Sequence, residues 1–289
     1  MLVSKEILAD IFPEISPEKI VTSKVIGGFI NECYKIEIED NTYFLKLNEA
    51  DKFPQMFEKE ARGLQALNAN TSLQIPKVEK VGITEHQQYL LLEFVQKGYK
   101  TKQFWVDFAE GIAQLHQNTH PFFGFEEDNF IGSLPQINKL NENWCEFFIT
   151  QRLQPQIKIA LDNQLIDKWF ATKFESFFHI LPSILPDEKP ALLHGDLWHG
   201  NYIINQEGKP CIFDPAVNYG CSEQEIAFTE LFGQMDDLFY ETYFEIKPSF
   251  AGYEERADIY NLYPLLVHAN LFGQMYLTGI EQIVKRFIG

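Results

Sequence analysis

Alternating apolar and polar residues dominate the first third of the chain. Between Ile20 and Leu47, three β-prone segments (KIVTSKVI, CYKIEIE and TYFLKLN) are separated by Gly27-Gly28 and by Asp40-Asn41, pairs that favour turns. Two further strands are predicted at about Lys77–Ile83 and Gln88–Val95. The pattern therefore predicts an antiparallel sheet of five strands.

Helical periodicity interrupts this pattern once and then governs the rest of the chain. After Pro54, the segment QMFEKEARGLQAL places Phe57, Ala61 and Leu64 on one face, which predicts a helix. Short apolar segments within loops are expected only between Leu192 and Asp214. The other predicted helices span about Thr101–Asn118, Asn141–Ala160, Gln164–Leu181, Glu223–Phe232 and, with interruptions, Glu254–Phe287.

This order of elements predicts an α+β protein of two lobes. A small antiparallel β lobe with one helix, residues 1–95, precedes a large, mainly α-helical lobe, residues 96–289. The polar stretch Gln96–Lys100 is a candidate hinge between them. The same order occurs in bilobal protein-kinase-like folds, in which nucleotide is held between the lobes.

Composition narrows the classes of partner. The formal net charge of −17 over 289 residues disfavours nucleic acid, whose phosphates need clustered lysines and arginines. Glu6 and Asp10 interrupt the N-terminal segment that a signal peptide would need to be apolar, and no apolar run is long enough to span a membrane. Four cysteines lack C-x-x-C spacing. We therefore expect a cytoplasmic protein with reduced thiols and no membrane partner.

The strongest chemical signal is LLHGDLWHGN, residues 192–201, followed by IFDP, which contains Asp214. Phosphoryl transfer needs a carboxylate that receives or orients the hydroxyl proton, and oxygen ligands for Mg²⁺. Asp196, Asn201 and Asp214 supply this set in the order and register found in kinases. Alone, Asp196 and Asn201 would equally fit a turn between two core strands. Their register with Asp214 after a β lobe favours Asp196 as the catalytic residue and Asn201 and Asp214 as metal ligands.

A second pair lies upstream. Lys46 alternates in phase with Phe44 on the predicted strand and so faces inward or into a cleft, where its charge needs a partner. Glu60, on the apolar side of the predicted helix, is the natural one, because such a pair positions ATP phosphates in kinases. The alternative is an exposed strand lysine with a surface glutamate.

Other candidate positions are less specific. The stretch GGFINECY, containing Gly27, Gly28 and Asn31, lacks the G-x-G-x-x-G spacing but precedes Lys46 as a phosphate-covering turn would. Glu93 and Val95 stand where a hinge would offer backbone groups to adenine. The i, i+4 pair His116 and His120 has no third ligand in the sequence, so we interpret both as ordinary histidines rather than a metal site.

Along nearly its whole length the chain resembles the fructosamine/ketosamine-3-kinase family. The matching segments include GGFINECY, FEKEARGL, HGDLWHGN, DPAVNYG, TELFGQ and YNLYPLLVHANLFGQMY, and the most specific are the Gly-Asp-Leu-Trp sequence and the stretch from Phe123 to Leu153. The resemblance implies a kinase that uses ATP and Mg²⁺ to phosphorylate the sugar 3-hydroxyl of fructosyl-, ribulosyl- or erythrulosyl-amines, glycated protein lysines included. Such an activity would reverse protein glycation.

The resemblance also implies an acceptor site. By this analogy Trp198, His268 and Glu223 contact the acceptor, and an aromatic ring such as that of Trp198 stacks well on a sugar or a cationic amine. This chain departs from the usual family pattern at His199 and Asn218 and at Cys221-Ser222, where the charged pair before Glu223 is lost while Glu223 itself is retained. These departures leave the preferred sugar open.

Two alternatives remain open at this point. The HGD-x-x-x-x-N pattern alone would also fit an aminoglycoside or choline kinase acting on another small alcohol. A pseudokinase that only binds its ligands is a different class of function. It is disfavoured, because a chain without catalytic demand has no physical reason to keep Lys46, Glu60, Asp196, Asn201 and Asp214 together.

Overall fold

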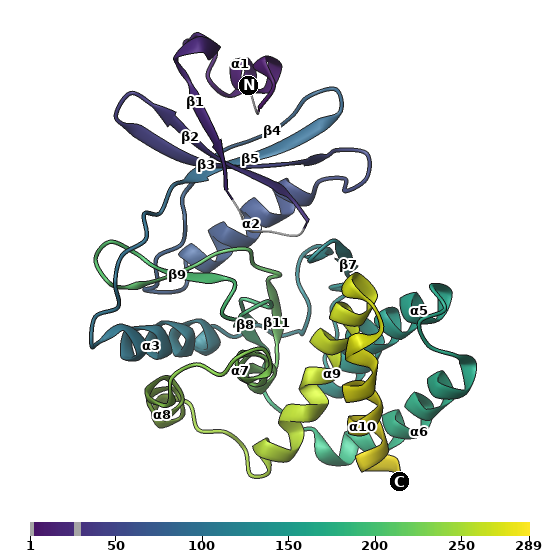
Figure 1. Ribbon diagram of the computed structural model, residues 1–289. Helices are drawn as coiled ribbons and strands as arrows, with labels where there is room; N and C mark the ends of the chain where they lie inside the picture. The colour runs from purple at the N-terminus through teal and green to yellow at the C-terminus, as the bar shows by residue number, and fades with distance from the viewer. Residues whose placement is uncertain (1–2, 26–29) are drawn as a thin grey trace.

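The computed structural model describes residues 3–25 and 30–289 and shows two lobes stacked one above the other (Figure 1). The upper lobe holds a five-stranded antiparallel sheet in the order β1-β2-β3-β5-β4, as its alternating sequence predicted. Helix α2 (Met56–Asn68) packs against this sheet below its strands. The strands are β1 (Val21–Lys24), β2 (Glu32–Ile38), β3 (Asn41–Glu49), β4 (Val78–Ile83) and β5 (Gln87–Glu93).

The small lobe has one helix that its sequence pattern did not predict. Helix α1 (Lys5–Ile11) begins at Ser4, whose hydroxyl accepts a hydrogen bond from Ile7 N at 3.2 Å. Ile7 and Leu8 pack with the sheet residues Ile36 and Leu45 in a core of the small lobe's own. The short 3₁₀ turn η1 (Pro17–Lys19) joins α1 to β1. This cluster closes the sheet on the side away from α2.

The large lobe is mainly helical, which confirms the predicted α+β class. Its helices are α3 (Phe104–Gln117), α4 (Trp144–Phe147), α5 (Gln154–Asp162), α6 (Lys168–Ile184), α7 (Ser222–Leu231), α8 (Asp237–Ile246), α9 (Tyr253–Phe272) and α10 (Leu277–Ile288), with a 3₁₀ turn η3 (Gln274–Tyr276) before the last. A π-helical stretch, η2 (Phe148–Leu153), joins α4 to α5. Helix α8 was not among the predicted helices. None of the helices in residues 3–25 and 30–289 is both long and apolar enough to cross a membrane.

Three short pairs of antiparallel strands lie where the large lobe meets the small one. They pair β6 (Asn129–Ile131) with β7 (Leu134–Gln136), β8 (Ala191–Leu193) with β11 (Asn218–Gly220), and β9 (Tyr202–Ile204) with β10 (Pro210–Ile212). Figure 1 shows β8, β9 and β11 between α2 above and α7 below. The loops between these strands therefore open toward the small lobe.

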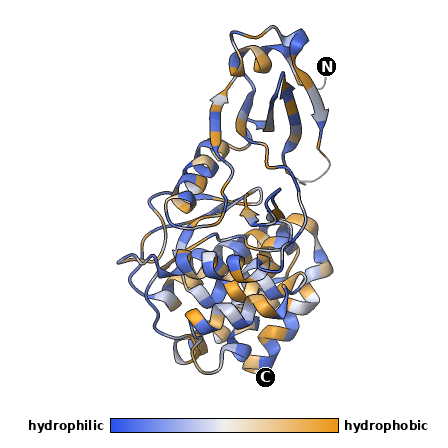
Figure 2. Cartoon of the chain, turned by 90° about the vertical axis from the view of Figure 1, so that its left-hand side faces the viewer, coloured by the Kyte–Doolittle hydropathy of each residue, from blue (hydrophilic) through white to orange (hydrophobic). Residues whose placement is uncertain are grey.

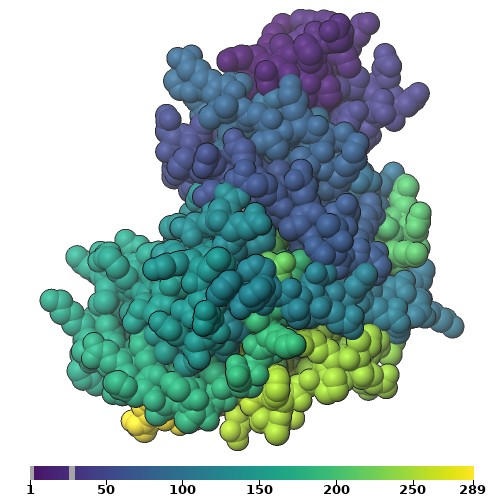
Figure 3. All heavy atoms as spheres, turned by 180° about the vertical axis from the view of Figure 1, so that it is seen from behind, coloured from purple at the N-terminus to yellow at the C-terminus, as the bar shows by residue number. Residues whose placement is uncertain are grey.

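The connection between the lobes runs between the end of β5 and the start of α3. Its Gly98 N–H donates to Ile204 O at 2.8 Å, so the connection is held against β9. Seen from the side and from behind, the narrower small lobe stands above the broader large one (Figures 2 and 3). Apolar residues of α2, α3, α7 and α9 form one core cluster that continues across the join. The predicted boundary at residue 95 falls within this connection.

Candidate active site

Lys46, on the small lobe, forms an ion pair with Asp214 of the large lobe. Its side chain leaves β3 only 3% exposed, and its Nζ lies 2.6 Å from Oε1 of Glu60 on α2 and within hydrogen-bonding distance of Asp214 Oδ1. Burial alone would lower the pKa of Lys46, but the charges of Asp214 and Glu60 raise it above its ordinary value. The ammonium is therefore a positive charge held in place next to Asp214 of the large lobe.

The loop after β8 carries the predicted catalytic residue. Asn201 Nδ2 donates to the carboxylate Oδ2 and to the backbone carbonyl of Asp196, both at 2.8 Å. The two hydrogen bonds thus join residues five positions apart and close the loop between them into a small ring. This ring fixes the direction of the Asp196 carboxylate before any ligand binds.

Backbone geometry sets the loop against the segment that carries Asp214. Gly195 has φ +83°, and a Cβ built there would lie 2.0 Å from the carbonyl oxygen of Ala216, so only glycine fits. Asp214 itself has φ +57°, the left-handed region that residues with a side chain rarely adopt. Strain of this kind costs about 1–3 kcal/mol and persists only where the surroundings enforce it. Here it turns the Asp214 carboxylate back toward Lys46.

Desolvation changes the acidity of Asp196. Burial raises the pKa of this carboxyl to about 7, and the nearby charges of Asp214 and Glu225 act in the same direction, while the Asn201 hydrogen bond opposes them. A carboxylate with a pKa near neutrality can take up a proton from a substrate hydroxyl and release it again. This is the electrostatic setting that a catalytic base requires.

Glu225 supports the loop and was not predicted from the sequence. Its two carboxylate oxygens accept the backbone N–H of His194 at 3.1 Å and of Gly195 at 2.6 Å, and its Oε2 lies 3.0 Å from His116 Nε2. Burial alone would raise the pKa of Glu225, but the contacts with His116 and these amides bring it below its usual value. The burial of Glu225 within α7, which only the structure shows, explains why its carboxylate must have partners.

Two histidines play structural roles beside this carboxylate. His194 Nε2 lies 3.0 Å from Phe213 O, next to Asp214, and burial lowers the pKa of this imidazole. His116 is buried between Glu225 and the hydroxyl of Tyr243, which lies 2.6 Å from its Nδ1. His120 instead stacks on Tyr219, with ring centroids 4.7 Å apart. Among the described residues no cluster of three or more His, Cys, Asp or Glu could hold a metal ion.

A chain of ring contacts leads from the loop to α9. The ring of Trp198 lies 6.3 Å from that of Phe232, which in turn lies 4.2 Å from His268. His268 Nδ1 is 2.8 Å from Pro264 O, and burial lowers the pKa of this imidazole, which favours its neutral form. Trp198 and His268, both predicted to contact the acceptor, therefore line one aromatic surface beside Asp196.

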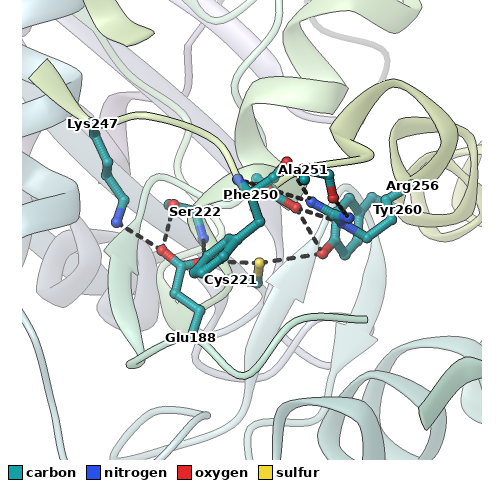
Figure 4. Close-up of polar contacts among 9 residues, drawn as sticks. Glu188, Cys221, Ser222, Lys247, Phe250, Ala251, Arg256 and Tyr260 are labelled. Carbon is teal, nitrogen blue, oxygen red and sulfur yellow. Dashed lines mark hydrogen bonds and ion pairs between the residues drawn. The ribbon is translucent and has the colours of Figure 1, made fainter. Parts of the chain in front are cut away.

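The structure does not bring Glu223 to this surface, contrary to the role expected for it. Glu223 is 4% exposed, and both its oxygens are bound by the guanidinium of Arg256, at 2.8 and 2.9 Å. The N–H of Phe250 and the hydroxyl of Tyr260 occupy the remaining acceptor positions. Figure 4 shows Arg256 and Tyr260 in this polar network together with Phe250 and Ala251. The buried ion pair leaves no oxygen for an acceptor, so we withdraw that role.

The predicted adenine side is only partly described. Glu93 ends β5, where its N–H donates to Lys77 O at 2.8 Å and its carboxylate accepts from Lys77 N at 3.2 Å. Val95 lies half-buried in the connection between the lobes. Asn31 Oδ1 accepts from Asn48 Nδ2 at 2.7 Å, which holds the end of the turn against β3. Gly27 and Gly28 lie outside the described residues.

Comparison with known proteins agrees with this geometry. The family model described as fructosamine kinase matches residues 9–289. The chain belongs to the fructosamine kinase family. It is 38% identical over 268 residues to a probable ketoamine kinase of Enterococcus faecium, covering 91% of this chain and 94% of the relative. It is 34% identical to the chloroplastic protein-ribulosamine 3-kinase of Arabidopsis thaliana, covering 91% and 81% of the two chains.

Solved structures confirm the fold of this fructosamine kinase family member. The crystal structure of a "Putative fructosamine-3-kinase" from Haemophilus somnus 129PT superposes with a TM-score of 0.87 at 31% identity, over 99% of this chain and 96% of that one. An aminoglycoside phosphotransferase superposes with a TM-score of 0.64 at 16% identity, over 99% and 98%. This second likeness shows the protein-kinase-like fold alone.

The donor set of the kinase fits Mg²⁺, which the family implies. Asn201 uses Nδ2 to hold Asp196, and in the described part of the chain nothing donates to its Oδ1. Asp214 uses Oδ1 to bind Lys46, so Oδ2 is the other oxygen it can present. Mg²⁺ prefers one or two such oxygens from protein and takes its remaining ligands from phosphate and water. The residues therefore fit the ion.

Proposed function

We propose that this protein is an ATP-dependent kinase that transfers the γ-phosphoryl group to the sugar 3-hydroxyl of a ketosamine. One observation carries the proposal: Lys46, Glu60 and Asp214 meet at the lobe interface beside the hydrogen-bonded pair Asp196 and Asn201. This is the set of groups that phosphoryl transfer uses to place phosphates and to receive the hydroxyl proton. Family membership adds the class of acceptor.

Each group has one role in this reaction. Lys46, fixed by Glu60, neutralises negative charge on the ATP phosphates, and Asp196 accepts the proton as the acceptor oxygen bonds to phosphorus and the bond to the ADP oxygen breaks. Asn201 and Asp214 would hold Mg²⁺, which shields the phosphate oxygens when bound. Asn31, Glu93, Val95 and the glycines Gly27 and Gly28 remain candidates for contacts with ATP.

The acceptor would lie on the aromatic surface beside the loop. Trp198 and His268 offer a ring face and a neutral imidazole nitrogen, which suit the apolar face and a hydroxyl of a sugar. The relatives named ketoamine kinase and ribulosamine 3-kinase support a small ketosamine, free or on a protein lysine. Phosphorylation of such adducts would serve protein deglycation, and the composition favours the cytoplasm as its place.

A panel of acceptors tests the proposal. ADP formation is measured with Mg-ATP and, in turn, fructosyl, ribulosyl and erythrulosyl amines, an aminoglycoside and choline. We expect one of the three ketosamines to be preferred by a wide margin in kcat/KM. A higher kcat/KM for choline or the aminoglycoside would overturn the acceptor class while leaving the kinase chemistry in place. No turnover with any acceptor would favour a pseudokinase.

A further inference from the structure

A buried polar network joins the β6–β7 hairpin to the segment that carries Asp214. Gln136 Nε2 donates to the carbonyl of Ala216 at 2.9 Å, and Asn129 Nδ2 donates to the carbonyl of Val217 at 2.8 Å. Gln136 also donates to Asn129 Oδ1 at 2.9 Å. Two adjacent backbone carbonyls, two and three residues after Asp214, are thus held by side-chain amides of the hairpin. The carbonyl of Ala216 also accepts from Asn218 Nδ2 at 3.1 Å.

Arg152 is connected to these amides through hydrogen bonds of Asn138. It is fully buried, and its Nη2 donates to Asn138 Oδ1 at 2.8 Å, while Asn138 Nδ2 donates to Asn129 Oδ1 at 3.0 Å. Its guanidinium packs on the rings of Phe147 and Tyr263, 4.6 and 5.5 Å from their centroids. The oxygens that it binds are neutral, and no carboxylate of residues 3–25 and 30–289 forms an ion pair with it, although the charge of Asp128 acts to raise its pKa.

A buried cation without a carboxylate partner needs a reason, because burial opposes the charge. Burial lowers the pKa of Arg152 to about 10, so the guanidinium is still protonated at neutral pH. The chain of donors runs in one direction, from Arg152 through Asn138 and toward the carbonyls of the Asp214 segment. Hydrogen bonds aligned in this way polarise and strengthen one another.

The held segment also touches the catalytic loop directly. Ala216 N–H donates to His194 O at 2.9 Å, and the backbone of Gly195 packs so closely against Ala216 that a Cβ would not fit. Tyr263 closes the network on the other side, since its hydroxyl donates to Gln136 Oε1 at 2.8 Å. Whatever holds Ala216 and Val217 therefore sets the spacing between Asp214 and the Asp196 loop.

We propose that Gln136, Asn129 and Arg152 are positioning residues for phosphoryl transfer, which fix the Asp214 segment against the Asp196 loop. The inference rests on the proposed kinase reaction. Displacement of reacting groups by about 1 Å can reduce a rate on the order of 100-fold. Loosening this network should therefore lower the rate and weaken the use of Mg²⁺, which Asp214 would hold, without removing any group that contacts substrate.

The test compares two buried arginines of the same lobe. Arg152→Lys and Gln136→Met disturb the network. Arg256→Lys instead disturbs the buried ion pair of Arg256 with Glu223, and this ion pair does not contact Ala216 or Val217 (Figure 4 shows Arg256). For each variant, kcat with the preferred ketosamine, the Mg²⁺ concentration giving half the maximal rate, and the melting temperature are measured. Tyr263→Phe, which removes one hydrogen bond and keeps the ring, serves if the larger changes prevent folding.

We expect Arg152→Lys and Gln136→Met to lower kcat at least 10-fold and to raise the half-saturating Mg²⁺ concentration at least 3-fold. Tyr263→Phe should move both in the same direction by a factor of about 3. Arg256→Lys should lower the melting temperature with both values within 2-fold of wild type. If the network variants behave like Arg256→Lys, the network is only structural and the inference fails. An inactive wild-type protein would instead count against the proposed function.

Discussion

Asp196 illustrates how one side chain depends on its surroundings. The sequence pattern identified it through its register with Asn201 and Asp214, but the pattern held no information on how deeply the carboxyl would be desolvated. The structure supplies that information, since burial raises the pKa of Asp196 to about 7. The raised pKa implies that the group changes protonation near neutral pH.

Asp196→Asn should separate catalysis from binding. The amide keeps the size of the side chain but cannot accept the hydroxyl proton, so kcat should fall by about 100-fold or more while the KM for ATP changes little. In the wild type, kcat/KM should fall as the pH drops below about 7, because the protonated carboxyl cannot act as a base. The pH profile of kcat/KM checks this, and the residual activity of Asp196→Asn should lack that acidic limb.

Substitution of Trp198 should affect acceptor binding rather than proton transfer. Its ring contacts those of His199 and Phe232 and belongs to the aromatic surface with His268. Trp198→Ala should therefore raise the KM for the ketosamine markedly, with the KM for ATP nearly unchanged. Steady-state kinetics with each substrate varied in turn measures both. An equal rise in the two KM values would show that the loop, rather than the acceptor contact, had been damaged.

At the scale of elements, much of the fold could be predicted and part of the site could not. The β-prone segments and the turn residues between them predicted the five strands, of which β5 is buried on both faces, with Leu90 and Leu92 in one core and Tyr89 and Leu91 in the other. Helix α8 escaped prediction, and α4 and α5 are interrupted by the π-helical turn η2, which no periodicity of 3.6 describes. Glu225 escaped because its partners are backbone amides, and amides have no sequence signature.

Helix α7 should therefore contribute to catalysis through its first turn. In Glu225→Gln one carboxylate oxygen becomes an NH₂ group, which cannot accept a hydrogen bond. The side chain can then no longer accept from both His194 N and Gly195 N through separate oxygens, so the loop should lose part of its support. We expect kcat to fall about 10- to 100-fold with modest changes in KM.

Glu223→Gln is a matched comparison, since it changes a buried carboxylate two residues away on the same helix. Its partners are Arg256, Phe250 and Tyr260 rather than the loop. Here we expect a lower melting temperature and a kcat close to wild type. Thermal denaturation and steady-state kinetics on both variants check the pair, and a selective rise in acceptor KM for Glu223→Gln would restore the acceptor role that the structure argues against.

For the molecule as a whole, polar contacts join the two lobes in several places. Thr71 Oγ1 donates to Gly111 O at 2.9 Å, Ser72 N donates to Gln114 Oε1 at 2.8 Å, and Asn205 Nδ2 donates to Gln74 Oε1 at 2.7 Å. Lys46 binds Asp214, Arg62 Nη2 on α2 donates to Glu127 Oε2 before β6 at 2.7 Å, and the Gly98 amide holds the connection to β9. Exposed ion pairs such as that of Arg62 contribute about 0–1 kcal/mol each. The relative placement of the lobes therefore depends on the shared apolar core, on Lys46 and on the hydrogen bonds of Thr71, Ser72 and Gln74.

Mg-ATP bound between the lobes should stabilise the whole molecule. A ligand at 100 times its Kd stabilises the native state by about 2.7 kcal/mol, so the melting temperature of the wild type should rise on adding Mg-ATP. Asp214→Ala removes the partner of Lys46 and a proposed Mg²⁺ ligand together, so the rise should shrink and turnover should be lost. Asp258→Ala breaks a different ion pair, with Arg286 on the outer surface, and should keep both the rise and the activity. Thermal shift with and without Mg-ATP measures the effect. Undiminished stabilisation and turnover in Asp214→Ala would remove Asp214 from the nucleotide site.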